Sequence, residues 1–456
     1  MASFVGELSA ETRNRSTTRF RIFDGDTESE ASPLVTHPKV DDKKSDPLVL
    51  SLSELRWSKA AFLILGVGVA MCWTMLQSGI SFFEAKYAMG SKFYLAMVAA
   101  YNIPVLPLLL AQAVLDRNYD VRFGAERTFL FRFVIGFGSL SAILCVVPFV
   151  NEFMCLFVVA LVGVMDSVAF GSSAQLFSMF PAECGSYYFI GASTTSLLSI
   201  AITVGSGFAN GTGTQTSAVI TYAISGFVTL LGLLSTITLI RSGVGQRILM
   251  AKTAADLENH KSDSTINNKD ESSLAGASSN SQLFGTTKYA HGALGLVWFV
   301  STLCGSMVSY VPSQDKSNSL KLILVYAGMI SSLLGKQFTL LRMPLWVTSQ
   351  QRLFASVVAL SLFACFFIFY IAQSSINPTG TDYFTYDYLI IAHIAVFNFW
   401  GAFFSSMSYG MASELIESQT DKAQNSALLG LTLMVGVYLG LGGSFVLSYV
   451  LTAPVN

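Results

Sequence analysis

Apolar runs of about twenty residues recur along this chain, and each is long enough to cross the roughly 30 Å hydrocarbon core of a bilayer as one helix. Of the 456 residues, 52% are hydrophobic and 12% are charged, which is too apolar for a soluble chain of this length. The sequence therefore predicts an all-α polytopic membrane protein.

Eleven spans are predicted, six before and five after a polar interval. They cover residues 59–82, 94–115, 128–150, 153–177, 187–208, 217–240, 291–311, 320–341, 353–372, 386–409 and 426–451. The polar start of the chain lacks the apolar core of a secretory signal, and the interval is rich in Ser and Asn. We expect a disordered cytosolic tail (1–57), spans one to six (58–242), a flexible cytosolic loop (243–289) and spans seven to eleven (290–456).

The basic residues predict the orientation of these spans. Arg117, Arg122 and Arg127 lie in the loop after the second span, and further Lys and Arg residues lie in the interval after the sixth. Cytosolic loops carry the excess of such residues, so the N-terminus is expected in the cytosol and the C-terminus outside. Asn210, in the tripeptide NGT, then faces the outside and is a candidate N-glycosylation site.

Several classes of function lack their sequence signals. The four histidines are dispersed, no HExxH or paired-aspartate pattern occurs, and the six cysteines show no CxxC spacing. No GxxxxGK[ST] loop is present either, and the basic residues follow the membrane topology. We therefore expect neither an enzyme nor a nucleic-acid-binding protein, and no metal or cofactor.

Interrupted and polar spans favour a transporter. Pro104 and Pro107 break the second span, and GASTTSLLSIAITVGSG makes the fifth rich in small polar residues. Transporters use such spans to line a cavity, although small residues also let helices pack closely.

Asp166 is the most conspicuous charge within a span. It lies near the middle of the fourth, where an ionised side chain costs about 2.5 to 3.5 kcal/mol on insertion scales. Such residues usually face a cavity or a partner, so the alternatives are a functional site and a structural bond between helices.

Short motifs follow one another in an order that resembles the equilibrative nucleoside transporter family. GVAMCWTML is similar to its LPWN-like signature with Trp73 at the tryptophan, and FGSSAQLFSMFP, which begins at Phe170, lies without gaps on its QGSLFGLAGLLP-like pattern. SLLGK falls on the DWLGR-like pattern with Ser332 at the acid and Lys336 at the arginine. QQRLF matches an arginine at the start of the ninth span, and NFWGAFFSSMSYGM resembles an NG-containing segment in the tenth.

The resemblance implies a 6+5 major-facilitator-like arrangement and alternating-access transport of nucleosides or nucleobases, either facilitative or proton-coupled. The substrate-binding candidates are Trp73, Asp166, Phe170, Ser332, Lys336 and Asn398, and the gating or structural candidates are Glu84 and Arg352. Trp73 could stack on a flat base, and Asp166 could replace the acid missing at Ser332. Lys336 could equally extend its amine to the cytosolic interface.

Departures from the family pattern leave other functions open. Phe170 replaces a glutamine and Ser332 an acid, so another small polar or cationic solute, handled by a battenin-like or other major-facilitator relative, is an alternative. A non-transporting trafficking protein is a second alternative. The expected partners are a small-molecule substrate, the lipid bilayer and protons. We expect the plasma membrane, with endosomal or lysosomal membranes as the alternative indicated by ESEASPLV in the tail.

Overall fold

The structure is a computed structural model of the chain. It describes residues 50–87, 92–208, 214–266, 272–308, 311, 319–340, 347–376, 387–416 and 418–452. The helices up to the polar interval are α1 (Leu52–Ser78), α2 (Ile80–Lys86), α3 (Lys92–Asn102), α4 (Val105–Phe123), α5 (Ala125–Val146), the 3-10 helix η1 (Val147–Phe149), α6 (Glu152–Ser178), α7 (Ala182–Gly205) and α8 (Gln215–Arg241). Those that follow are α9 (Gly243–Ile266), α10 (Ser272–Met307), α11 (Ser319–Phe338), α12 (Gln350–Ile376), α13 (Asp387–Glu414) and α14 (Gln419–Thr452).

The described helices confirm a multi-pass membrane protein. Ten helical segments within the described ranges are long and apolar enough to cross a membrane, and α11 contributes a shorter apolar stretch, Ile323–Phe338. Each of the eleven predicted spans overlaps one of these segments. The second span consists of α3 and α4 together.

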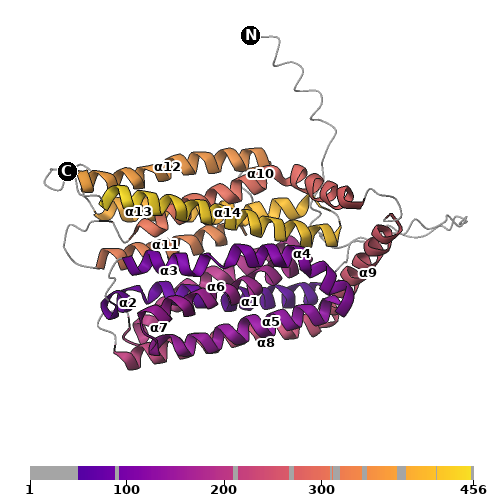
Figure 1. Ribbon diagram of the computed structural model, residues 1–456, viewed down its shortest axis with the longest axis horizontal. Helices are drawn as coiled ribbons and strands as arrows, with labels where there is room; N and C mark the ends of the chain where they lie inside the picture. Colours follow the sequence, from indigo (N-terminus) through magenta and orange to yellow (C-terminus); the bar gives the residue numbers. More distant parts are fainter. Residues whose placement is uncertain are drawn as a thin grey trace, which may run out of the picture. The chain divides into compact units, whose positions relative to one another are not determined.

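The spanning helices form two groups (Figure 1). In the first group α1 packs along α7 and α8, and in the second α10 packs along α14 and α11 along α13. The groups meet where α7 contacts α11 and α13, and where α14 contacts α4 and α6. The larger hydrophobic cluster fills the first group and includes α14 residues, so the interface between the groups is continuous with that core.

Glycines allow a very close contact between α1 and α7. A Cβ atom on Gly66 would lie 2.1 Å from the carbonyl oxygen of Tyr188, and one on Gly191 would lie 2.0 Å from that of Leu63. Only glycine permits this approach, which is how helices associate in a bilayer that offers no hydrophobic driving force between them.

The interval after the sixth span differs from the expected flexible loop. Residues Gly243–Ile266 form α9, because Val244, Ile248 and Leu249 supply an apolar face that is buried against the first group of helices. Lys252 of the same helix is buried in an ion-pair network. The residues of ESEASPLV lie outside the described part of the chain, and α1 begins earlier than expected, at Leu52.

Candidate functional site

The second span is interrupted at Pro104, one of the two prolines predicted to break it. The other, Pro107, lies in the first turn of α4, where a proline is tolerated. Proline lacks the N–H that would continue the helix, so α3 ends at Asn102 and α4 begins at Val105. The end of α3 lies directly against α6, since a Cβ atom on Gly163 would be 2.0 Å from the carbonyl oxygen of Tyr101. Tyr438 of α14, in the other group of helices, donates its hydroxyl to the carbonyl oxygens of Asn102, at 3.0 Å, and Ile103 at the break.

This break places Tyr101 beside Asp166. The Tyr101 hydroxyl donates a hydrogen bond to Oδ2 of Asp166, and the Trp73 ring stacks on the Tyr101 ring with centroids 4.2 Å apart and planes at 23°. Asp166 is only 8% exposed, and its Oδ1 has no hydrogen-bond partner among the described residues. A carboxylate, a phenol and an indole from three spans thus form one cluster, with one acceptor atom left over.

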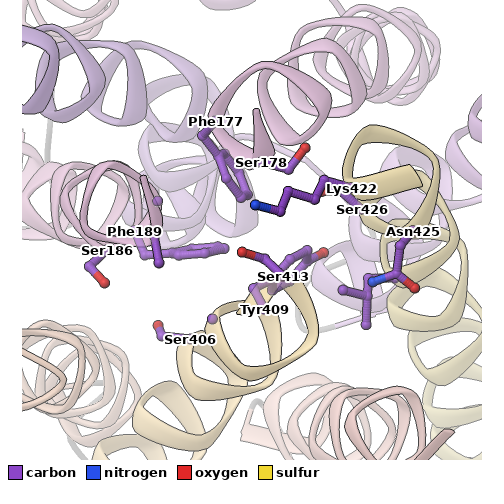
Figure 2. A pocket seen from close by; sticks show the side chains of 14 residues that line it. Phe177, Ser178, Ser186, Phe189, Ser406, Tyr409, Ser413, Lys422, Asn425 and Ser426 are labelled. Carbon is purple, nitrogen blue, oxygen red and sulfur yellow. The ribbon is translucent and has the colours of Figure 1, made fainter. Parts of the chain in front are cut away.

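A cavity lies between the two groups of helices (Figure 2). It is formed by the end of α6, the start of α7, the end of α13 and the start of α14. The polar and aromatic side chains that line it are Phe177, Ser178, Ser186, Phe189, Ser406, Tyr409, Ser413, Lys422, Asn425 and Ser426.

Three aromatic rings meet at this cavity. The Tyr409 centroid lies 5.1 Å from that of Phe189 and 6.0 Å from that of Phe177, and the two phenylalanine centroids are 5.3 Å apart. Figure 2 shows the Lys422 amine extending into the space beside these rings. The hydroxyl oxygens of Ser406 and Tyr409 have no hydrogen-bond partner among the described residues.

The Asn425 side chain is oriented from outside the cavity. Its amide oxygen accepts a hydrogen bond from Thr287 at 3.0 Å and lies 3.3 Å from Nε2 of His291. Nδ1 of His291 in turn lies 2.8 Å from the hydroxyl of Thr432. These contacts occupy the oxygen of Asn425, so its amide nitrogen is the atom that remains for the cavity.

The sequence-predicted binding residues do not form a single site. Trp73 and Asp166 lie together, joined by Tyr101. Phe170 lines a second cavity of about 250 Å³ between α4, α6 and α14. The Lys336 amine lies 6.0 Å from the centroid of Phe189, at the edge of the larger cavity.

The other predicted residues lie away from both cavities. Asn398 donates to the carbonyl of Ile394 at 2.8 Å and faces α11, and Ser332 is half-buried on α11. Arg352 is exposed in the first turn of α12, where it donates to Thr348 at 3.1 Å. Glu84 lies on α2, where the structure describes its backbone but not its side chain. Asn210 lies outside the described residues.

The sequence reasoning missed Tyr101, Tyr409 and Lys422. Tyr101 had a usable signal, because an aromatic hydroxyl directly before a helix break can reach a neighbouring span. Tyr409 and Lys422 gave none: a tyrosine in the tenth span and a lysine before the last span both suit the membrane interface.

A buried ionic network lies within the first group of helices and α9. Arg132 lies 3.0 Å from Asp116 and 3.2 Å from Asp120, and Lys252 lies 2.5 Å from Asp120 and 2.7 Å from Asp256. These charges are nearly removed from solvent, so each depends on its partners. The network attaches α9 to α4 and α5.

The sequence matches no protein-family model and no curated protein. The structure is similar to that of the MFS (major facilitator superfamily) proton:xylose symporter XylE bound to 6-bromo-6-deoxy-D-glucose, with a TM-score of 0.54 and 12% identity over 86% of this chain and 88% of that one. The E. coli fucose:proton symporter FucP gives a TM-score of 0.46 and 12% identity over 86% of this chain and 98% of that one. The expected major-facilitator-like fold is therefore confirmed at the level of the fold.

Proposed function

We propose that this protein is a secondary transporter that moves nucleosides or nucleobases across a membrane by alternating access. The observation that carries the proposal is the buried cluster of Asp166, Tyr101 and Trp73, in the middle of a major-facilitator-like fold. An intramembrane carboxylate is costly, and a cluster that joins it to two aromatic rings is suited to a solute with both hydroxyl groups and a flat ring.

The unpartnered Oδ1 of Asp166 gives the cluster two possible tasks in transport. It could accept a hydrogen bond from a sugar hydroxyl, or hold a proton that travels with the solute. Either task requires the α3–α4 break, because the break places Tyr101 against Asp166 and gives the second span a point at which to bend.

With eleven spans, the N-terminus in the cytosol and the C-terminus outside, the ends of α6 and α13 and the starts of α7 and α14 face the cytosol, and so does the larger cavity. The two groups of helices are in contact at both ends of α7. Tyr409 packs on Phe177 and Phe189 at the cytosolic end, and Thr203 Oγ1 lies 3.4 Å from the Tyr326 hydroxyl at the opposite end. We assign the transporter to the plasma membrane.

Uptake of radiolabelled adenosine and hypoxanthine into transporter-null cells tests the proposal, with and without a proton ionophore. Asp166→Asn should reduce uptake by about 10- to 100-fold, as expected for loss of a hydrogen bond to a charged group. Glu152→Gln is the matched control, since it removes a carboxylate from the first turn of the same helix and should change uptake little. Equal uptake by the wild type and Asp166→Asn across pH would refute a role for the cluster.

A further inference from the structure

We infer that the larger cavity selects a small planar organic anion. The inference rests on the proposed function and narrows it, from nucleobase-like solutes in general to flat rings that carry one negative charge. Orotate and nicotinate are representatives of this chemical class.

Charge is the first argument. Lys422 extends into the cavity and forms no ion pair among the described residues. Glu183, in the first turn of α7, is already paired with Lys59. Lys336 adds a second cation behind Phe189 and has no acidic partner in the described part of the chain either. Lys422 is therefore the one charged side chain among the described residues that line the cavity.

The N-terminus of α7 adds to the positive field of Lys422. It begins at the cavity, where Ala182 and Gly185 are lining residues. The start of α14 is capped instead by Ser418, whose hydroxyl accepts a hydrogen bond from the N–H of Asp421 at 3.4 Å. The N-cap of α7 is Pro181, whose side chain caps no backbone N–H. Unbonded N–H groups and the helix dipole both favour an anion at such an end.

Two buried hydroxyl groups also favour an anionic ligand, on evidence that does not depend on charge. Ser406 and Tyr409 are 7% and 4% exposed, and neither hydroxyl has a partner among the described residues. Buried polar groups are nearly always hydrogen-bonded in native proteins, so the hydroxyl groups of Ser406 and Tyr409 are available to donate to an acceptor atom of a ligand. Both come from α13 and line the cavity that Lys422 enters from α14, which places two donors and one cation around one space.

The shape of the ligand follows from the rings. Phe177, Phe189 and Tyr409 wall the cavity with three aromatic faces from α6, α7 and α13. Such faces favour a flat ring, which stacks on them or meets their edges. The one lysine among the lining residues suits a ring that carries one carboxylate.

Matched pairs of compounds test the inference, because each pair shares its ring and differs in charge. The pairs are orotate with uracil and nicotinate with nicotinamide. Purified full-length protein is heated with each compound, and the rise in melting temperature gives the relative affinity. The acid of each pair should bind about 10- to 100-fold more tightly than its neutral partner, as expected for a charge-assisted hydrogen bond.

Variants of one lysine assign that preference to the cavity. Lys422→Gln should abolish the difference within each pair, while Lys422→Arg should keep most of it. Lys288→Gln is the matched control, because Lys288 is an exposed lysine of α10, with its amine 5.2 Å from the ring centroid of Tyr289, and does not line the cavity. Its preference should equal that of the wild type.

The outcomes separate this inference from the proposed function. Uptake of adenosine or hypoxanthine without any preference for the acids overturns the inference and leaves the proposed function standing. A preference for the acids that persists in Lys422→Gln also overturns the inference. Transport of none of the six compounds overturns both, whereas uptake of the acids that depends on Lys422 supports both.

Discussion

Replacing Lys252 should release α9 from the helices beneath it. Lys252→Met leaves Asp256 without its ion-pair partner and removes one of the two cations that neutralise Asp120, while its length preserves the packing of the stem. Asp120 and Asp256 are 0% and 1% exposed, so neither gains solvation in compensation. Breaking a buried ion pair from one side costs about 3 to 5 kcal/mol, which is the loss of stability that we expect.

The assay is the free energy of unfolding of the purified protein in detergent, measured by denaturant titration. Arg247→Gln serves as the control on the same helix, because its ion pair with Glu54 is exposed and water screens it, so stability should change little. Adding Asp256→Asn to Lys252→Met should recover part of the loss, since one uncompensated charge is removed. Equal losses in Lys252→Met and Arg247→Gln would refute the claim that the buried network holds α9.

Two further substitutions test the geometry of the helix break. Gly163→Ala should destabilise the protein by about 1 to 3 kcal/mol and impair uptake, because the added Cβ would meet the Tyr101 carbonyl. Gly138→Ala is the control and should change neither property, because the space around Gly138 is open. Thermal unfolding and uptake are measured for both variants. Tyr438→Phe should cost about 0.5 to 1.5 kcal/mol through the lost hydrogen bond, while Tyr449→Phe, at an exposed position, should be neutral in the same unfolding assay. A neutral Tyr438→Phe would mean that the break needs no donor from α14.

Local sequence was sufficient for the spans and for the break in the second of them. Apolar runs give the length and place of each membrane helix, and Pro104 has the same effect on backbone hydrogen bonding in any context. The same reasoning failed for residues 243–266, because the Ser- and Asn-rich interval predicts a flexible loop there. Val244, Ile248 and Leu249 have the spacing of one helix face, and their burial depends on helices distant in sequence.

The candidate site was predictable only in part. An acid in the middle of the fourth span and a tryptophan in the first span are each unusual, and the structure joins them through Tyr101. Lys422 and Tyr409 are ordinary residues for the ends of spans, and their importance arises because two helix ends from different parts of the chain meet there. Contacts between spans depend on the tertiary fold, so they could not be predicted from residue type and spacing alone.

The hydrogen bonds that Tyr438 makes across the two groups of helices bear on how the protein is assembled during synthesis. Tyr438 lies 335 residues after Ile103, whose carbonyl it contacts, so the ribosome completes the second span long before α14 exists. Until then the carbonyls of the break have no protein donor in a membrane that provides none in its hydrocarbon core. A newly inserted first group of helices is thus an unfinished structure, which needs water, a lipid headgroup or a chaperone at this point until its last helix arrives.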